Sequence, residues 1–225
     1  AVYFSSYDDL GPTSKSYLTA LAIAVSIIGQ IIRAYTIGTT PKGTSGRNTE
    51  EQVAEVLNST GIYSVVRHPL YLGNYFMWIG IVMYTMNFYF VVIVSLLYWL
   101  YYERIMFAEE RFLEKKFGQA YLDWSLKAPA FIPQFSKWVK SKIPFSIISV
   151  LRREYSGVLA TVIGFVFVDA LRLLIFPILK QDTLNTDWLS IFRIQLYVLG
   201  ISVVITLILR TLKHSTQLLR EEGRS

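Results

Sequence analysis

The residues whose types could do chemistry gather in two short segments. The first is GIYSVVRHPLYLGN, residues 61–74, in which Arg67 and His68 directly precede Pro69. Proline lacks an amide hydrogen and has the φ of a helix, so it predicts a helix that starts at Pro69. A guanidinium, an imidazole and the free amides of a helix start together favour an anionic group. The alternative is a helix start whose polar side chains only anchor the protein at a membrane surface.

The second segment is YYERIMFAEERFLEKKFGQAYLDW, residues 101–124. It is expected to form an amphipathic helix that ends near Gly118, since glycine commonly follows the last residue of a helix. Glu109 and Glu110 are adjacent and point about 100° apart on a helix, so one can face a pocket while the other is solvated. The alternative is a charged helix whose carboxylates are all solvated.

Five apolar stretches must position these segments. They cover about residues 17–32, 69–86, 88–102, 156–179 and 189–209, and about 20 apolar residues suffice to cross a membrane. The sequence therefore predicts an all-α polytopic integral membrane protein with five transmembrane helices and cytosolic amphipathic helices. A polar turn at Asn87 is expected to join the second and third spans as a helical hairpin, which brings the two chemical segments together. An acidic stretch, residues 181–187, joins the last two spans.

Composition excludes several functional classes. The 225 residues are 53% hydrophobic, 17% charged and 15% aromatic, which is too apolar for a disordered or an ordinary soluble chain. With no cysteine and only His68 and His214, neither a disulfide framework, a catalytic thiol nor a metal site is expected. The net charge of +6 divides between loops and no nucleic-acid recognition module is visible, so no nucleic-acid partner is expected.

Charge asymmetry predicts the orientation. With five alternating spans, 18 of the 22 Lys and Arg fall in the connections on one side, and only Lys15 and Lys180 fall on the other. Cytoplasmic loops hold the positive excess, so the N-terminus is expected outside and both chemical segments in the cytosol. The compactness of the chain favours a prokaryotic inner membrane. The chain begins with Ala1 rather than Met, which leaves open a segment upstream, including a further span.

The two segments also resemble a known family. RHPLYLGN, followed after a hairpin by ERIMFAEERFLEKKFGQAYLDW and APAFIP, resembles the isoprenylcysteine carboxyl methyltransferase-like group of integral membrane methyltransferases and its phospholipid methyltransferase relatives. The resemblance covers residues 61–133. It implies S-adenosylmethionine as the methyl donor, bound at the cytosolic membrane face. By position, His68 corresponds to the ligand of the donor's carboxylate, Glu109 or Glu110 to the carboxylate on the adenosyl side, and Arg104 to the arginine near the reacting end. The residues expected to bind the cofactor are Arg67, His68, Tyr71, Gly73, Asn74, Glu109 and Glu110, and those expected to act in catalysis are Arg104 and Glu110.

The resemblance favours a membrane enzyme that methylates an amphiphile whose reactive head lies at the cytosolic interface. The acceptor could be a prenylated thiol or carboxylate, a phospholipid amine or a lipid phosphate. One alternative is a nicotinamide-dependent reductase, since membrane sterol reductases share an R-x-P-Y-like block, although no GxGxxG motif is present. Another is a non-catalytic scaffold whose segments are interfacial anchors.

Two regions depart from a minimal member of this family. Residues 39–61 are unusually polar, and Thr49 is expected to cap a short helix through Leu57 that either lines the donor site or lies in a surface loop. The other departure is a two-span extension at 136–225, after an N-terminal extracytoplasmic segment at 1–16 and a methyltransferase core at 17–135.

Three charged residues lie within the expected spans of this extension. Asp169 and Arg172 are three residues apart, and Arg193 lies in the last span. Charges within spans usually face inward or pair. Asp169 and Arg172 can pair on one helix face, which leaves a structural ion pair and a substrate head-group site as equal alternatives.

Overall fold

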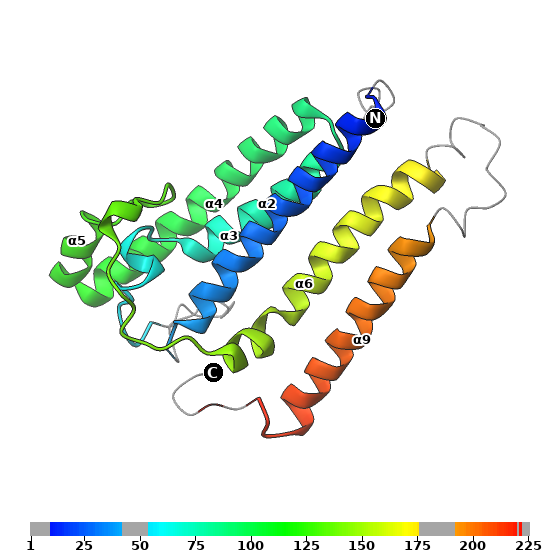
Figure 1. Ribbon diagram of the computed structural model, residues 1–225. Helices are drawn as coiled ribbons and strands as arrows, with labels where there is room; N and C mark the ends of the chain where they lie inside the picture. The colour runs from blue at the N-terminus through cyan, green and yellow to red at the C-terminus, as the bar shows by residue number, and fades with distance from the viewer. Residues whose placement is uncertain (1–9, 42–53, 176–191, 220, 222–225) are drawn as a thin grey trace.

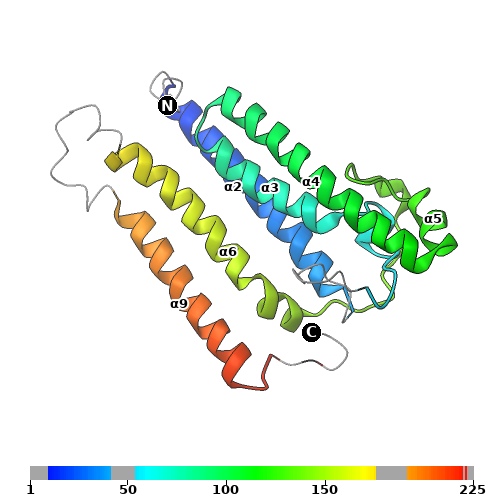
Figure 2. The same ribbon diagram turned by 180° about the vertical axis from the view of Figure 1, so that it is seen from behind.

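The computed structural model describes residues 10–41, 54–175, 192–219 and 221, and within these ranges the chain is helical with one isolated β-bridge. Its long helices lie alongside one another (Figures 1 and 2). The predicted all-α fold is therefore confirmed. The long helices are α2 (Pro12–Gly38), α3 (Pro69–Met83), α4 (Phe88–Phe117), α6 (Ile147–Ala170) and α9 (Arg193–Ser215). The shorter elements are α5 (Gln119–Ser125), the 3₁₀ helices η1 (Ile62–Ser64) and η2 (Phe135–Lys137), and the π-helix η3 (Leu171–Ile175), which continues α6.

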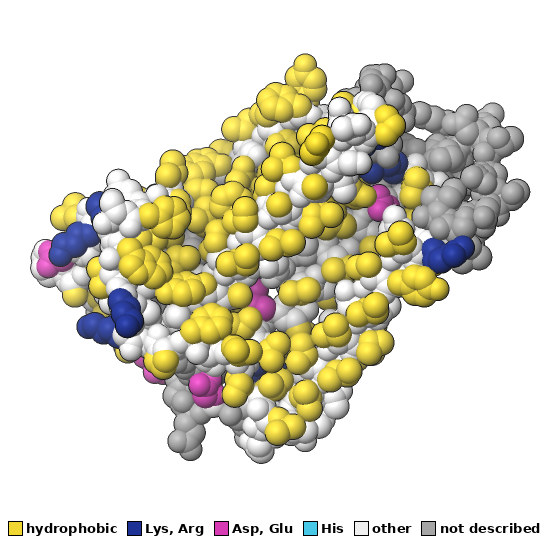
Figure 3. All heavy atoms as spheres, in the orientation of Figure 1, with side chains coloured by type: hydrophobic (Ala, Val, Ile, Leu, Met, Phe, Trp, Pro, Cys, Tyr) yellow, Lys and Arg dark blue, Asp and Glu magenta, His cyan; other side chains and the backbone are white. Residues whose placement is uncertain are grey.

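Four of these helices are long and apolar enough to cross a membrane, namely α2, α4, α9, and α6 extended to Leu173. The apolar helix α3 has 15 residues, or about 22 Å, which is less than the hydrocarbon core of about 30 Å. Large hydrophobic side chains cover the face in Figure 3, and charged side chains gather mainly at its two ends. The chain is an integral membrane protein.

The two ends of the helical bundle differ in what they carry. We call the end at which α2 ends and α3 begins the site end, and the opposite end the far end. The helix α6 starts at the site end, because the Ser146 amide donates to the Gly38 carbonyl at 2.9 Å. Residues 84–87 at the far end connect α3 to α4, as the predicted hairpin requires.

The helix α4 carries the second chemical segment beyond the membrane. It starts after Asn87, whose side chain accepts a hydrogen bond from the Phe90 amide at 3.0 Å. Its 30 residues span about 45 Å, so residues 88–107 are enough to cross the hydrocarbon core and the last turns extend past it at the site end. Gly118 follows the last residue with φ +53°, a conformation that favours glycine. The predicted continuous helix and its end are confirmed.

Other predicted boundaries differ from the structure. The helices α2 and α6 begin before the predicted spans, because Pro12 suits a helix start and the Ser146 side chain caps α6 by accepting from the Ser149 amide at 3.0 Å. The expected turn at residues 181–187 lies outside the described residues, as does Thr49. Residues 54–57 are described and are not helical, so the helix expected through Leu57 does not include them.

The helices α2 and α3 cross with their backbones in close approach. A Cβ atom on Gly29 would lie 2.5 Å from both the Gly73 carbonyl oxygen and the Met77 amide nitrogen. The Ser26 hydroxyl donates to the Met77 carbonyl at 2.9 Å, which adds a hydrogen bond at the same crossing. Small residues permit this kind of helix contact in membranes, and here they fix the position of α3, from which the site is built.

The C-terminal helices are joined to the rest of the bundle by a buried ion pair. Arg33 of α2 donates two hydrogen bonds to Glu154 of α6, both at 2.7 Å. Their side chains are only 10% and 4% exposed. The helix α9 packs along α6 (Figure 2). The predicted domain boundary at residue 136 stays a prediction, and α6 is bound to the core by the Arg33–Glu154 ion pair.

Candidate active site

The site is built on the turn that leads into α3. The backbone amides of Arg67 and His68 donate to the carbonyls of Pro129 and Ala130, at 2.8 and 3.3 Å. Val65, just before them, is fully buried and accepts from the Gln134 amide at 2.9 Å. The segment APAFIP at residues 128–133 therefore runs against the helix start and fixes its backbone.

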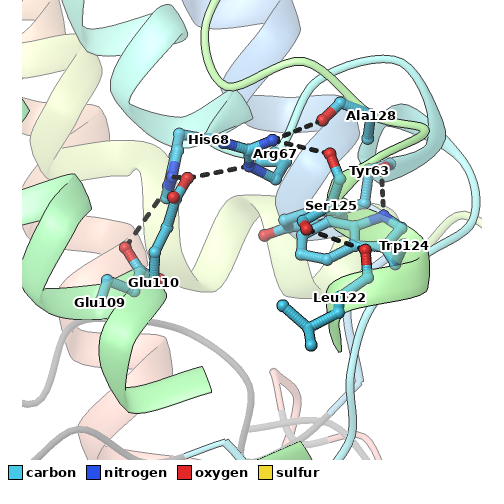
Figure 4. A network of polar contacts seen from close by, with 9 residues as sticks. All are labelled: Tyr63, Arg67, His68, Glu109, Glu110, Leu122, Trp124, Ser125 and Ala128. Atoms are coloured by element: carbon cyan, nitrogen blue, oxygen red, sulfur yellow. Dashed lines mark hydrogen bonds and ion pairs between the residues drawn. The ribbon is translucent and has the colours of Figure 1, made fainter. Parts of the chain in front are cut away.

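The side chain of Arg67 connects three parts of the site end (Figure 4). Its Nε donates to Glu110 Oε1 at 2.8 Å. Its Nη1 donates to the carbonyls of Ser125 and Ala128, at 2.9 and 2.8 Å. These bonds satisfy a largely buried guanidinium and tie the turn before α3 to α4 and to the segment after α5.

The ring of His68 lies between two carboxylates (Figure 4). Its Nε2 is 2.8 Å from Glu110 Oε1, and its Nδ1 is 3.6 Å from Glu109 Oε2. The residue is 5% exposed. Burial alone would lower the pKa of His68, but the adjacent carboxylates outweigh it and raise the pKa above its usual value of 6.5. The structure thus favours a protonated imidazolium whose Nε2 donates to Glu110, while its Nδ1 lies at ion-pair distance from Glu109.

Glu110 lies beyond the membrane-crossing part of α4 and receives both cations. Partial burial opposes its ionisation, yet hydrogen bonds and charge from His68 and Arg67 lower the pKa of Glu110 to about 2 from the usual 4.5. Arg67 and His68 are therefore occupied by a carboxylate of the chain itself, and the expected binding of an anionic ligand at the start of α3 stays a prediction.

Glu109 has a different environment from its neighbour. Its Oε2 is buried and, among the described residues, has no hydrogen-bond partner. Glu109 lines a small cavity of about 40 Å³ together with His68 and Tyr71. The Tyr71 ring stacks on His68 at 5.6 Å between centroids and contacts the Tyr102 ring at 5.2 Å. A carboxylate oxygen left without a donor in such a cavity can accept a hydrogen bond from a ligand.

A second cavity adjoins the first. It measures about 330 Å³ between α2, α3 and α6, and it shares Leu70 and Tyr71 with the small cavity. Its wall includes Arg33, Trp78 and Gly157, so it lies within the helical bundle. Leu70 and Tyr71, in the first turn of α3, line both cavities.

Three predicted site residues do not join the cluster around His68. Gly73 faces α2, because a Cβ there would lie 2.9 Å from the Gly29 carbonyl. Asn74 accepts a hydrogen bond from Arg33 Nη1 at 2.6 Å and lines the larger cavity. Arg104 is exposed, and on a helix it points about 140° from Glu109. Packing and helix rotation thus turn Gly73 and Arg104 away from the cluster, and their expected roles stay predictions.

The structure also adds residues that the motifs did not indicate. Tyr102 precedes Glu109 by seven residues and so lies on the same helix face, a spacing that could have revealed it. Arg33 is a charge within an apolar helix, which is itself a signal of an inward-facing residue. Tyr63 also lines the small cavity, and no feature of the sequence indicated it as a site residue. Within the described ranges, no group of three or more His, Cys, Asp or Glu is placed to hold a metal ion.

Comparison with known proteins agrees with this arrangement. Residues 15–120, which contain most of α2 together with α3, α4 and the cluster, match the family model described as phospholipid methyltransferase. This segment, just under half of the chain, is thus similar to the phospholipid methyltransferase family. The helices α6 and α9 lie outside it.

Several known proteins are similar to part of the chain. Protein-S-isoprenylcysteine O-methyltransferase of Schizosaccharomyces pombe is 37% identical over 79 residues, covering 35% of this chain and 33% of its own. The protein of the same name from Tribolium castaneum is 27% identical over 137 residues, covering 58% and 47%. Nickel-cobalt-cadmium resistance protein NccN of Alcaligenes xylosoxydans xylosoxydans is 30% identical over 134 residues, covering 59% and 56%. The matched segments thus span from a third to just over half of these relatives, and no solved structure matches the chain.

Proposed function

We propose that the protein is an S-adenosylmethionine-dependent methyltransferase that acts on a membrane-embedded amphiphile at the cytosolic interface. Its homology to isoprenylcysteine O-methyltransferases supports the reaction. The observation that carries the proposal is the buried carboxylate oxygen of Glu109, which accepts no hydrogen bond among the described residues and lies at ion-pair distance from His68, beside the Arg67 and Glu110 contacts. This oxygen lies where the last turns of α4 approach the start of α3.

The residues present fit the methyl donor in part. Glu109 can accept a hydrogen bond from a ribose hydroxyl or face the sulfonium cation. Arg67 and His68 suit the donor's carboxylate, but Glu110 already occupies them, so that carboxylate must share or exchange these partners. When bound, S-adenosylmethionine supplies an electrophilic methyl group. Positioning and exclusion of water can then account for most of the rate.

The structure favours a positioning role for Glu110 rather than a role as a base. A general base works best with a pKa near the working pH, and the pKa of Glu110 is about 2. A carboxylate or phosphate acceptor needs no base, whereas an amine acceptor must lose a proton at some stage. Glu110 is therefore assigned to orienting Arg67 and His68. No contact of the exposed Arg104 supports its expected catalytic role, which stays a prediction.

The larger cavity is the proposed place for the acceptor. It lies inside the membrane-spanning bundle and shares Leu70 and Tyr71, in the first turn of α3, with the small cavity that Glu109 lines. An amphiphile could enter from lipid and present its head beside the donor. Candidate heads are a prenylated carboxylate or thiol, a phospholipid amine and a lipid phosphate. The excess of Lys and Arg on the site-end side supports a cytosolic site, in what we propose to be a prokaryotic inner membrane.

Isothermal titration of the detergent-purified protein with S-adenosylhomocysteine tests the donor site. We expect binding to the wild type, no binding of NADPH, and clearly weaker binding to Glu109→Gln and His68→Ala. Glu114→Gln is the matched control, because Glu114 lies on the same helix and, within the described part of the chain, forms its ion pair with the exposed Arg111. Equal affinity of Glu109→Gln and Glu114→Gln, or no binding to a folded wild type, would contradict the proposal. Transfer of labelled methyl groups to isoprenylcysteine, phosphatidylethanolamine and lipid phosphates then identifies the acceptor.

A further inference from the structure

A third cavity lies between the helices of the C-terminal extension and α2. It measures about 420 Å³ and most of its lining comes from α6 and α9, which lie outside the segment that matches the family. Its size is within the range of about 300–1,000 Å³ typical of small-molecule sites. The body of the cavity is mainly apolar, with Ile27, Val162 and Phe165 among its walls, and its polar residues Gln30 and Thr161 are hydrogen-bonded to each other at 3.0 Å.

The polar end of this cavity lies at the far end of the bundle. Asp169 lies 23 residues after Ser146, the cap residue of α6, which corresponds to about 35 Å along the helix. This length slightly exceeds the thickness of the hydrocarbon core. Tyr84, at the far end of α3, donates to Asp169 Oδ1 at 2.8 Å. The cavity therefore has a polar group at one membrane boundary and an apolar body towards the membrane centre.

The charge of Asp169 is already balanced by the chain. Arg172 Nη1 lies 3.5 Å from Asp169 Oδ1, as expected for residues three apart on a helix. Arg172 also donates to the Tyr84 carbonyl at 2.6 Å and lies over the Tyr84 ring. The ion pair anticipated from the sequence is thus formed. A charged ligand would be unbalanced here and costly within a membrane, so the site favours a neutral group.

The polar end also includes the side-chain amide of Gln195. Gln195 Nε2 donates to Asp169 Oδ2 at 3.0 Å. Because a carboxylate only accepts hydrogen bonds, this contact fixes which side of the amide faces Asp169. Gln195 Oε1 is left buried and without a hydrogen-bond partner among the described residues. A buried carbonyl oxygen that lines a cavity calls for a neutral donor.

We propose that this cavity binds a membrane lipid with a hydroxyl head, drawn from the leaflet opposite the methyl-transfer site. The hydroxyl donates to Gln195 Oε1 at the far membrane boundary, and the hydrocarbon chain lies along α6 and α9 towards the membrane centre. This is the orientation that a lipid of that leaflet already has. The site is separate from the His68 cluster, and its occupancy does not depend on methyl transfer.

Photolabelling of the purified full chain in detergent tests this site. The probe is a twelve-carbon primary alcohol with a diazirine in its chain, and labelled peptides are mapped by mass spectrometry. We expect labelling to concentrate on α6 and α9 residues that line the cavity. Excess 1-dodecanol should compete about five- to tenfold better than dodecyl methyl ether, because the ether lacks the donor for one buried hydrogen bond.

Variants separate the head-group contact from the apolar body. Gln195→Leu should abolish the preference for alcohol over ether, whereas the exposed Gln217→Leu should retain it. Val162→Phe, which fills the cavity, should reduce labelling, whereas Val204→Phe on the exposed face of α9 should not. Equal competition by alcohol and ether in the wild type would overturn the proposal, whether or not Gln195→Leu folds. Labelling spread evenly over the lipid-facing surface would overturn it as well.

Discussion

Breaking the Arg33–Glu154 ion pair should cost more stability than any exposed pair in the described chain. Glu154→Leu removes two charge-assisted hydrogen bonds of 2.7 Å, each worth about 1.5–3 kcal/mol. It leaves the Arg33 guanidinium buried, with Asn74 as its one remaining hydrogen-bond partner among the described residues. Removal of one partner from a buried pair costs about 3–5 kcal/mol. This is a large part of the about 5–15 kcal/mol that typically stabilises a native protein.

A double-mutant cycle measures the coupling. Unfolding of Glu154→Leu, Arg33→Leu and the double variant is followed by tryptophan fluorescence during titration with sodium dodecyl sulfate in mixed micelles. The double variant should lose much less than the sum of the single variants, because neither charge is then left alone.

The exposed pair Arg111–Glu114 provides the control for this cycle. Its atoms are also close, at 2.9 Å, but the side chains are 64% and 37% exposed. Glu114→Leu should therefore change the free energy of unfolding by less than about 1 kcal/mol. A loss for Glu154→Leu no larger than that for Glu114→Leu would refute the reasoning that this pair joins α6 to the core.

Two further predictions concern pH and packing. The pKa of Glu110 is lowered to about 2 from 4.5, so its contribution to stability is complete above pH 4.5 and is lost as pH falls towards 2. The pKa of His68 is raised above 6.5, so its contribution is complete below pH 6.5 and is lost as pH rises through the raised value. Glu110→Gln should therefore destabilise most between about pH 5 and 6.5. Gly73→Ala should destabilise by about 1–3 kcal/mol because its Cβ would meet α2, whereas Gly200→Ala, with open space around it, should stabilise α9 by up to about 1 kcal/mol.

The same detergent titration, repeated across pH and on each variant, checks both predictions. A constant stability difference between wild type and Glu110→Gln from pH 3 to pH 8 would show that the ion pairs do not contribute as described. Unchanged stability of Gly73→Ala would contradict the close approach of α2 and α3. Weaker donor binding by a fully stable Gly73→Ala would instead support the cofactor-binding role expected for this glycine from the sequence.

The sequence predicted the helices well where the cause is local. Pro69 starts α3, Asn87 caps α4 and Gly118 ends it, each through a property of that residue alone. Apolar runs of membrane-spanning length predicted the long helices. The starts of α2 and α6 were placed too late, because Pro12 and Ser146 start those helices before the apolar run begins.

The site was predicted less completely. Arg67, His68, Glu109 and Glu110 do come together, as the hairpin between α3 and α4 requires. Which carboxylate binds both cations, and which keeps an unpartnered oxygen, depends on the rotation of α4 and could not be read from two adjacent glutamates.

The sequence by itself determined a helical membrane protein, the start of α3 and the two segments that carry chemistry, because proline, glycine and apolar length act locally. Only the tertiary structure decided that Glu110 occupies the predicted anion site, that Gly73 faces α2, and that Glu154 pairs with Arg33. These outcomes depend on how helices distant in sequence cross and rotate against one another. Side-chain identity alone does not encode that geometry, since the same residue can face lipid, a cavity or a neighbouring helix.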